Sequence, residues 1–366
     1  MVVAMQVTIV TEGDPDRMSG GFLYHRRVAD LAGRFGATVR FASVPERPYP
    51  LAAVDGPAVM RSATAGADVV VVDSLASNTL GPWLAAGLGR RVPIVGSVHQ
   101  GLGGIDVGPL RRAVQTRFDR SAWRRATHLI VASEMLAAEL ADGGLGLDDM
   151  TVVPPGRDVP TGGPPSIDQP GRPGRGLRQG RSAALLCVGN WLSRKGIIEV
   201  LDGVATMPEQ SATLHLVGDE DVDAAYRHRV VERLGRADLV GRVVRHGIVD
   251  PGHMHALYGA ADAFVLASTV EPYGTVYGEA MAAGLPVIGW AAGNLPHLAT
   301  DGVEGRIVRT GDIAGLAAAM TTVATDEALR YRMGRAALSR AEKLPTWEET
   351  AERFVAVCRR AADAHR

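Results

Sequence analysis

Short apolar runs alternate along the whole chain with stretches in which apolar residues recur at helical spacing. Runs such as Gln6–Thr11 (QVTIVT) and Ala263–Leu266 (AFVL) are mostly apolar at consecutive positions, so we expect both faces of these strands to be covered. The stretches between them carry apolar residues on one side, as amphipathic helices do. Strands that alternate with helices predict βαβ units and therefore parallel sheets.

The pattern falls into two series. In the first, the predicted strands are Gln6–Thr11, Thr38–Ala42, Val69–Val72, Pro93–Val98, Leu129–Ala132 and Thr151–Val153, and the predicted helices are Phe22–Arg34, Thr79–Leu88, Leu110–Arg125 and Glu134–Ala141. In the second, the strands are Ala184–Val188, Thr213–Val217, Val243–His246, Ala263–Leu266 and Pro286–Trp290, and the helices are Ile197–Ala205, Ala224–Leu234, Pro251–Ala261 and Tyr277–Ala283. A helical tail begins at Ile313 and ends with a helix over Glu348–Ala362.

The segment between the two series, residues 154–181, is rich in Pro, Gly and Arg and holds few apolar residues. It has too little apolar surface to bury and is typical of a loop or linker. We therefore predict an α/β protein with a first domain over residues 1–160, a linker over 161–182 and a second domain over 183–345. Two such domains would face each other across a cleft, which is where ligands bind to open α/β sheets.

Composition and charge narrow the class of protein. The chain has 366 residues, 46% of them apolar and 22% charged, as in a soluble globular protein. Its net charge of −1 gives no general reason to expect binding to nucleic acid or to an anionic membrane. The start, MVVAMQVTIVTEGD, lacks the basic region of a signal peptide, and no apolar run is long enough to span a membrane. Cys187 and Cys358 have neither metal-like nor disulfide-like spacing, so we predict buried thiols in a cytoplasmic protein.

The most informative stretch is EPYGTVYGEAMAAGLP, from Glu271 to Pro286. It lies between two predicted strands, so its acidic residues are expected where a parallel strand leads into a helix. The backbone N–H groups of Gly274, Thr275 and Val276 would point out of the N-terminus of that helix and would suit a phosphate. Glu271 and Glu279 could accept hydrogen bonds from hydroxyls of a sugar or a ribose.

Arg194 and Lys195 follow Gly189-Asn190, after the first strand of the second series. Two cations at a turn from strand to helix suit a diphosphate, whose negative charge grows as a bond to it breaks. The alternative is a pair of solvated surface cations. Only two of the 39 basic residues are lysines, Lys195 and Lys343, and this rarity favours a functional ammonium group.

The first series offers two smaller signals. Gly20-Gly21 precedes the first helix and would let the backbone approach a phosphate, although a structural turn explains the pair equally well. The sequence there is not the G-x-G-x-x-G fingerprint, so a nicotinamide cofactor is poorly supported. His99 ends the strand PIVGSVH and could donate to a sugar hydroxyl or stabilise developing charge; a histidine bonded to local backbone is the alternative.

A basic stretch over residues 111–125 has apolar residues between its arginines. The arginines are Arg111, Arg112, Arg117, Arg120, Arg124 and Arg125. The stretch could contact an anionic lipid or a charged acceptor. A solvated helix face is the other interpretation, and the pattern favours it.

Taken together, these motifs resemble the retaining glycosyltransferases of family 4, which have two Rossmann-like domains in the GT-B fold. The resemblance runs along nearly the whole chain and is strongest from Cys187 to Val308. EPYGTVYGEAMAAGLPVIGWAAGNLPHLATDG resembles the family's donor-binding signature, VGNWLSRKGIIEVL its diphosphate-binding turn, and SVH its histidine motif. The last helix, about residues 346–366, resembles the family's C-terminal helix, which crosses back to the first domain.

The resemblance implies a role for each of these residues. Glu271 would hold hydroxyls of the donor sugar, and Glu279 the ribose of the nucleotide. The backbone of Gly274, Thr275 and Val276 would bind the diphosphate together with Arg194 and Lys195. Gly20 and Gly21 would approach the same phosphates from the first domain, and His99 would hydrogen-bond the sugar. Asn190 would also contact the donor, although family members often carry arginine at this position, which would shift the contact to Arg194.

The sequence therefore predicts a bacterial, metal-independent enzyme without a cofactor that transfers a sugar from a UDP- or GDP-linked donor, with retention, to an acceptor held by the first domain. Small metabolites and natural-product scaffolds are the acceptors we favour, and lipid or polysaccharide assembly at a membrane surface is the alternative. A sugar-nucleotide epimerase of the same fold and a non-catalytic nucleotide-sugar sensor are the remaining alternatives. We expect a monomer or a homodimer, no nucleic-acid partner, no transmembrane segment, and at most peripheral contact with a membrane.

Overall fold

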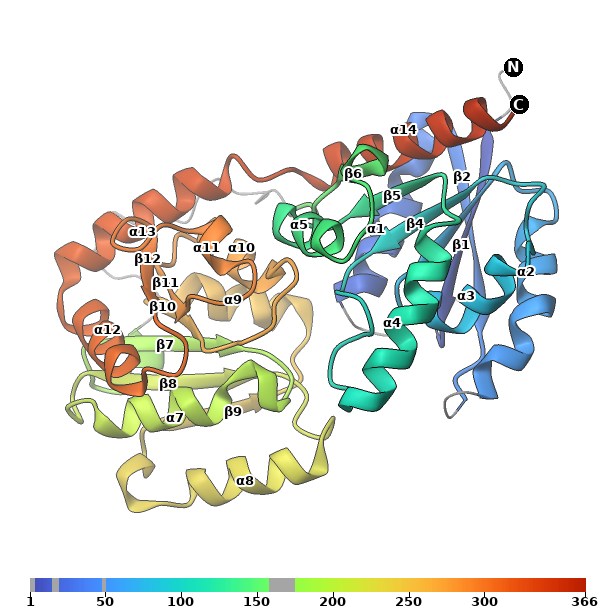
Figure 1. Cartoon of the computed structure of the whole chain (residues 1–366). Coiled ribbons are helices and arrows are strands. Elements are labelled where there is room, and N and C mark those ends of the chain that lie inside the picture. Colours follow the sequence, from blue (N-terminus) through green and yellow to red (C-terminus); the bar gives the residue numbers. More distant parts are fainter. Residues whose placement is uncertain (1–3, 15–19, 48–50, 158–174) are drawn as a thin grey trace. The chain divides into compact units, whose positions relative to one another are not determined.

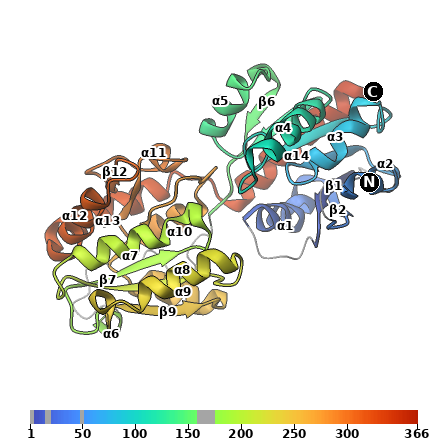
Figure 2. The ribbon, with the colours of Figure 1, turned by 60° about the horizontal axis from the view of Figure 1, so that its bottom comes forward.

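The computed structural model describes residues 4–14, 20–47, 51–157 and 175–366 (Figure 1). The chain forms two compact units. Unit 1 comprises Met1–Gly156 and Pro345–Arg366, and unit 2 comprises Arg157–Leu344. Each unit is built on a six-stranded parallel sheet with helices packed on it (Figures 1 and 2). The predicted α/β fold class with two Rossmann-like domains is confirmed.

Unit 1 alternates strands and helices as the apolar pattern predicts. Its elements are β1 (Met5–Glu12), α1 (Gly20–Ala32), β2 (Ala37–Val44), α2 (Gly56–Thr64), β3 (Val69–Asp73), α3 (Ser77–Ala85), β4 (Ile94–Val98), α4 (Pro109–Trp123), β5 (His128–Val131), α5 (Glu134–Asp142), β6 (Met150–Val152) and α14 (Trp347–His365). The strand order is β2-β1-β3-β4-β5-β6. The strands β3 and β4 are buried at every position, because helices cover both faces of the sheet.

Helix α14, the last helix of the chain, packs in unit 1 beside α1 and against β3, β4 and β5. Phe354 and Cys358 are fully buried in the same core cluster as Val71 and Tyr24. A capping box begins the helix: Thr346 Oγ1 accepts from the N–H of Glu349 at 3.2 Å. The segment 345–366 therefore completes the core of unit 1, although unit 2 separates it in sequence from the rest of that unit.

Unit 2 repeats the alternation. Its elements are α6 (Arg175–Arg178), β7 (Ala183–Val188), α7 (Ile197–Thr206), β8 (Ala212–Val217), α8 (Ala224–Leu234), β9 (Val243–Gly247), α9 (Pro251–Ala260), β10 (Ala263–Leu266), α10 (Thr275–Ala282), β11 (Val287–Trp290), α11 (Leu295–Leu298), β12 (Gly305–Val308), α12 (Ile313–Thr325) and α13 (Glu327–Ala341). The strand order is β12-β11-β10-β7-β8-β9, and all neighbours are parallel.

The sequence pattern missed three short elements, α2, α11 and β12, and the helical turn α6. Residues 158–174, most of the predicted linker, lie outside the described part of the chain. The last part of that linker is ordered by charge: Arg178 in α6 donates twice to the buried Asp262, at 2.6 and 2.9 Å. Composition alone did not indicate this pair, because the two residues are 84 positions apart.

Candidate active site

The strand order of unit 2 reverses beside β7. From β7 the chain adds β8 and β9 on one side, then returns to place β10, β11 and β12 on the other. The carboxyl ends of β7 and β10 therefore mark a topological switch point, where open α/β sheets bind their ligands. Asn190, Arg194 and Lys195 follow β7, and Glu271 follows β10, so the topology brings the two loops that carry them to this edge.

Glu271 is the buried charge of this edge, with 8% of the residue exposed. Lys195 Nζ donates to its Oε1, and the hydroxyl of Ser268 donates to the same oxygen at 3.0 Å. Arg194 Nη1 lies 3.8 Å from that oxygen. Two cations and a hydroxyl therefore compensate a carboxylate that would otherwise be unstable in a buried position. The sequence predicted Glu271, Arg194 and Lys195 as site residues but not that they contact one another.

A glycine lets the two loops meet. Gly196 has φ 67°, and a Cβ there would collide with the backbone oxygen of Ala267. Because the backbones lie so close, the N–H of Thr269 donates to the carbonyl of Arg194 at 2.8 Å. Arg194 Nη1 donates in turn to the carbonyl of Val270 at 3.2 Å. These bonds fix the Arg194-Lys195 turn against the segment that leads to Glu271.

Helix α10 starts at this edge with Gly274 as its N-cap, at φ 83° and ψ 48°. Among the described residues, none accepts a hydrogen bond from the N–H of Thr275 or Val276. The hydroxyl of Tyr277 donates to the carbonyl of Leu266 at 2.9 Å and holds the first turn of the helix against β10. Unpaired N–H groups at the positive end of a helix dipole suit an anion such as phosphate.

Glu279 lies one turn further along α10 and is exposed. Its Oε2 accepts a hydrogen bond of 2.8 Å from the hydroxyl of Tyr258 in α9. Burial raises the pKa of Tyr258 well above its usual value, and the negative charge of Glu279 raises it further. Tyr258 therefore stays a donor that orients this carboxylate. The sequence holds no local signal for Tyr258. For Ser268 the S-x-x-E spacing to Glu271 is such a signal, although it did not enter the prediction.

Asn190 is exposed and turns toward the loop after β8. Its Oδ1 accepts from the N–H of Asp219 at 3.1 Å. Beside it, Gly218 lies so close to Gly189 that a Cβ would collide with the carbonyl of Gly189. Asn190 thus ties together the loops after β7 and β8.

In unit 1 the corresponding reversal lies between β1 and β3, and His99 follows β4 at the same edge of the sheet. Gly20 is the first residue of α1, and Gly21 is the second. A Cβ on Gly21 would lie 4.0 Å from Cδ2 of His99, which is an ordinary van der Waals distance. The backbone of Gly21 therefore lies close beside the histidine ring. The second glycine of the predicted pair and the predicted histidine are therefore neighbours.

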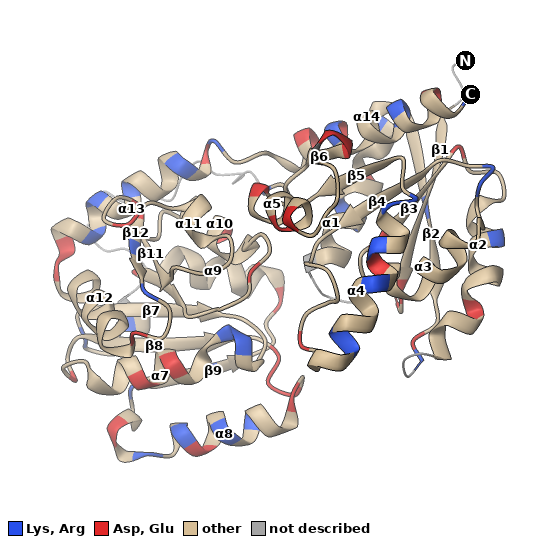
Figure 3. Ribbon diagram, in the orientation of Figure 1, with Lys and Arg blue, Asp and Glu red and all other residues tan. Residues whose placement is uncertain are grey.

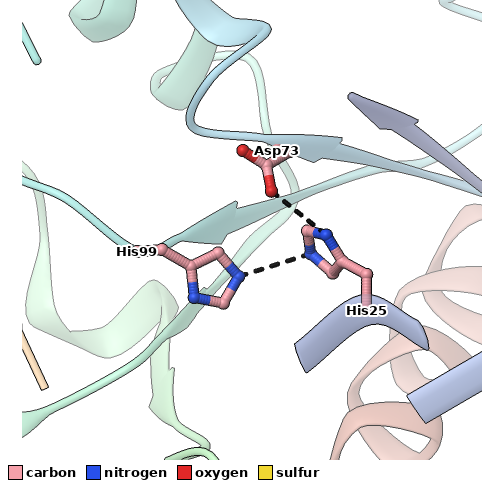
Figure 4. Close-up of side chains that lie close together, drawn as sticks. All are labelled: His25, Asp73 and His99. Atoms are coloured by element: carbon pink, nitrogen blue, oxygen red, sulfur yellow. Dashed lines mark hydrogen bonds and ion pairs between the residues drawn. The ribbon is translucent and has the colours of Figure 1, made fainter. Parts of the chain in front are cut away.

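His99 belongs to a buried polar cluster that the sequence did not indicate (Figure 4). Its Nε2 lies 3.0 Å from Ser97 Oγ and 3.3 Å from Nε2 of His25. His25 Nε2 lies 3.1 Å from Ser97 Oγ, and its Nδ1 lies 3.1 Å from Oδ2 of Asp73. We name these four residues, from α1, β3, β4 and the end of β4, the histidine cluster. His25 stands in the middle of a helix and Asp73 ends a buried strand, so neither follows a recognisable motif.

Burial sets the charges of the histidine cluster. It lowers the pKa of His99 to about 4 and that of His25 well below its usual value, with the neighbouring His99 lowering the pKa of His25 further. It raises the pKa of Asp73 to about 7, against hydrogen bonds from Leu75 and Ser74 that lower it. Both imidazoles are therefore neutral at neutral pH, and Asp73 is the group that titrates there.

Three members of the cluster, His25, Asp73 and His99, offer ligand atoms within 4.8 Å of one another. Imidazole and carboxylate are the donor set of many zinc and iron sites. In the part of the chain that the structure describes, this is the group of side chains that could hold a metal ion. The prediction of a metal-independent enzyme is not tested by this geometry.

The basic stretch 111–125 forms most of α4, whose arginines Figure 3 shows as bands along the helix. Arg111, Arg112 and Arg117 are exposed, and Leu110 beside them is 81% exposed. The opposite side of the helix is anchored by Asp119, which accepts from Ser77 Oγ at 2.6 Å and from the N–H of Gly103 at 2.8 Å. Among the described residues, no helix is both long and apolar enough to cross a membrane.

Two families match the sequence, one in each half. Residues 4–156 match the "Glycosyl transferase 4-like domain" and residues 174–340 match "Glycosyl transferases group 1". Among the relatives, glycogen synthase of Mycobacterium tuberculosis is 32% identical over 274 residues, or 71% of this chain and 61% of that protein. Mannosylfructose-phosphate synthase of Agrobacterium fabrum is 30% identical over 179 residues, covering 47% of this chain and 39% of that protein. The chain thus matches less than two thirds of the length of either relative.

Solved structures with the same fold are more distant in sequence. Sucrose-phosphate synthase from Thermosynechococcus elongatus is similar with a TM-score of 0.82 at 22% identity, over 98% of this chain and 100% of that one. Anabaena HepE, solved in complex with UDP-glucose, has a TM-score of 0.75 at 20% identity, over 98% of this chain and 99% of that one. At these identities the likeness bears on the fold, and it agrees with two Rossmann-like units.

Proposed function

The chain belongs to the group 1 glycosyl transferases, and on this basis we propose that it moves a sugar from a nucleoside-diphosphate sugar to an acceptor. The observation that carries the proposal is the cluster at the switch point of unit 2, where Lys195 and Arg194 surround Glu271. A strongly basic patch would bind any polyanion. Here a carboxylate that can accept hydrogen bonds from hydroxyls lies among cations that can bind phosphate. A nucleoside-diphosphate sugar carries both hydroxyls and phosphates.

The diphosphate would bind to the N–H groups of Thr275 and Val276 and to the two cations. Lys195 is paired with Glu271, and this contact positions its ammonium group at the edge where the diphosphate would bind. Glu271 would then accept from hydroxyls of the sugar, and Glu279, held by Tyr258, from those of the ribose. Uridine and guanosine diphosphate sugars are the donors we propose, with UDP first because HepE is described with UDP-glucose.

In the proposed reaction the bond between the anomeric carbon and the diphosphate oxygen breaks while the acceptor oxygen bonds to the same face of that carbon. Because the new bond forms on the face that the diphosphate leaves, configuration is retained, and the acceptor's proton passes to the departing phosphate oxygen. Negative charge grows on the diphosphate during this step, and Lys195, Arg194 and the start of α10 are placed to stabilise it more in the transition state than before. None of these contributions requires a divalent cation.

The acceptor class follows less directly from the site. The relatives named above make, by their names, glycogen or a sugar phosphate, and unit 1 carries exposed arginines on α4 that suit an anionic group. We propose a small hydroxyl-bearing metabolite bound by unit 1. An acceptor of lipid or polysaccharide assembly is the second candidate, favoured by the exposed Leu110 among those arginines.

A thermal-shift screen against UDP, GDP, ADP and dTDP, each free and as the glucose or mannose conjugate, tests donor binding, because a ligand of the native state raises the melting temperature. The best donor is then incubated with glucan, sugar phosphates, inositol phosphate and lipid acceptors while release of nucleoside diphosphate is followed. Release that depends on an acceptor supports transfer. An altered sugar without release would indicate an epimerase, and binding without either would indicate a sensor; both would overturn the proposal.

A further inference from the structure

The histidine cluster connects a buried carboxylate to the ring of His99 through polar atoms no more than 3.3 Å apart. We propose that Asp73, His25 and Ser97 are positioning residues that hold His99 in the tautomer with its proton on Nε2, which leaves Nδ1 as a hydrogen-bond acceptor for a substrate hydroxyl. The role of the hydroxyl rests on the function proposed above, whereas the tautomer follows from the cluster itself.

The inner end of the cluster fixes the first proton. Asp73 Oδ1 accepts from the N–H of Leu75 at 2.6 Å, and Oδ2 lies 3.1 Å from Nδ1 of His25. His25 and Asp73 are both buried, at 0% and 1% exposure, so water does not separate them. A nitrogen lone pair that close to an ionised carboxylate would be repelled, and the proton of a neutral His25 therefore belongs on Nδ1, even though the contact is not aligned as an ideal hydrogen bond.

The next proton belongs to Ser97. With Nδ1 protonated, Nε2 of His25 is an acceptor, and the hydroxyl of Ser97 at 3.1 Å is placed to donate to it. A hydroxyl has one proton, so Ser97 Oγ can then only accept from Nε2 of His99 at 3.0 Å. This arrangement gives every contact between Asp73 and His99 one donor and one acceptor. With His25 protonated on Nδ1, a His99 that was also protonated on Nδ1 would leave two nitrogen lone pairs facing each other at 3.3 Å.

The outer end of the cluster is the other nitrogen of His99, which Figure 4 shows on the side of the ring away from His25. His99 is only partly buried, and among the described residues none hydrogen-bonds to its Nδ1. Tyr24 packs edge-on against this ring with centroids 4.7 Å apart, and its own hydroxyl donates to the carbonyl of Val153 at 3.1 Å. The ring is thus fixed in orientation as well as in tautomer, and its exposed nitrogen accepts rather than donates.

Nitrogen-15 NMR of the full chain with labelled histidine tests the tautomer directly, at about pH 8, where Asp73 is ionised. Spectra of His25→Gln and His99→Gln assign the two signals. We expect His25 to be protonated on Nδ1 and His99 on Nε2. In Asp73→Asn the side-chain oxygen keeps the bond from Leu75, so the amide N–H₂ faces His25 and both tautomers invert. Asp119→Asn, which changes another buried carboxyl outside the cluster, should change neither signal.

A wild-type His99 protonated on Nδ1, or an Asp73→Asn spectrum with unchanged tautomers, overturns the proposal whether or not the protein transfers sugar. If transfer is established, Asp73→Asn should lower kcat about tenfold or more with a smaller change in KM, and its melting temperature reports folding separately. A variant with inverted tautomers and wild-type kcat would refute the role of Nδ1. If no transfer is found but the tautomers are as expected, the proposed function fails and the assignment of the ring stands.

Discussion

Lys195 Nζ donates to Glu271 Oε1, although the two residues are 76 positions apart and lie on the loops after β7 and β10. Both side chains are nearly buried, with exposed fractions of 13% and 10%. A buried pair of this kind adds little net stability. Removing one partner nevertheless destabilises the protein strongly, because the other charge stays buried without compensation. The pair therefore orients two groups for a ligand more than it holds unit 2 together.

Replacing Lys195 by alanine should reduce kcat/KM by about 100-fold, because a cation directed at the leaving diphosphate typically contributes that much. Its loss should also lower the free energy of unfolding by about 1–3 kcal/mol, since among the described residues Glu271 would keep Ser268 and the more distant Arg194 as side-chain partners. Lys343→Ala is the matched control, because it removes the other lysine, which is exposed. Initial rates and urea unfolding of both variants measure the two effects. Equal rates for the two variants would contradict the assignment of Lys195.

Replacing Gly196 and Gly302 by alanine, one at a time, should distinguish the effect of a steric clash from the effect of a positive φ angle. Gly196 and Gly302 both have positive φ, at 67° and 79°, so alanine at either position should cost about 1 kcal/mol. At Gly302 nothing lies within 4 Å of the added Cβ, whereas at Gly196 it collides with Ala267. We expect Gly196→Ala to be the more destabilising and to weaken donor binding, and Gly302→Ala to leave binding unchanged. Chemical denaturation measures the stability of the two variants, and titration with UDP measures their donor binding. Equal stability and equal binding would show that the loops after β7 and β10 can move apart at no cost.

The sequence predicted the sheet of each unit because parallel strands covered on both faces are apolar throughout, as in Val69–Val72. It also predicted Glu271, Arg194 and Lys195, because their spacing from strand ends and glycines forms motifs. It did not indicate His25, Asp73 or Tyr258. Their partners are 21 to 74 residues away, and such contacts depend on strand order rather than on local pattern.

Substitution of the two glutamates should affect different parts of the donor. Glu271→Gln keeps the volume but removes the charge that pairs with Lys195, and we expect kcat to fall by about 100-fold. Glu279→Gln keeps an acceptor for Tyr258, so we expect mainly a rise in KM for the donor, by about five- to tenfold. Kinetics with varied donor concentration separate the two effects. A rise in KM alone for Glu271→Gln would mean that this carboxylate does not act on the transition state.

Removal of divalent cations should leave turnover unchanged, because the proposed diphosphate site consists of cationic side chains and backbone N–H groups. Rates after dialysis against EDTA, with and without added Mg²⁺, measure this. If turnover falls and a metal restores it, His25, Asp73 and His99 are the first ligands to examine, since their ligand atoms lie within 4.8 Å of one another. In that case His25→Gln should abolish the restoration, whereas the exposed His255→Gln should not.

Acid should weaken unit 1 through His99, and the sign follows from its pKa. The folded protein holds the pKa of this imidazole at about 4, below the ordinary value of 6.5, so below pH 6.5 the unfolded chain binds a proton that the folded chain does not. Wild type should therefore lose up to about 3 kcal/mol relative to His99→Gln between pH 7 and pH 4.

Other groups lie in or near the cluster. Burial raises the pKa values of the carboxyl groups of Asp73 and Glu12. Burial also raises the pKa values of Tyr24 and Cys358, so these two stay protonated across this pH range. Asp73 acts in the opposite direction, because its folded pKa of about 7 lies above the usual 3.8 and favours the folded state as the pH falls through 7. Urea unfolding of wild type, His99→Gln and Asp73→Asn across this range isolates the two contributions. A difference between wild type and His99→Gln that does not depend on pH would mean that the ring titrates normally and that its burial does not set its charge.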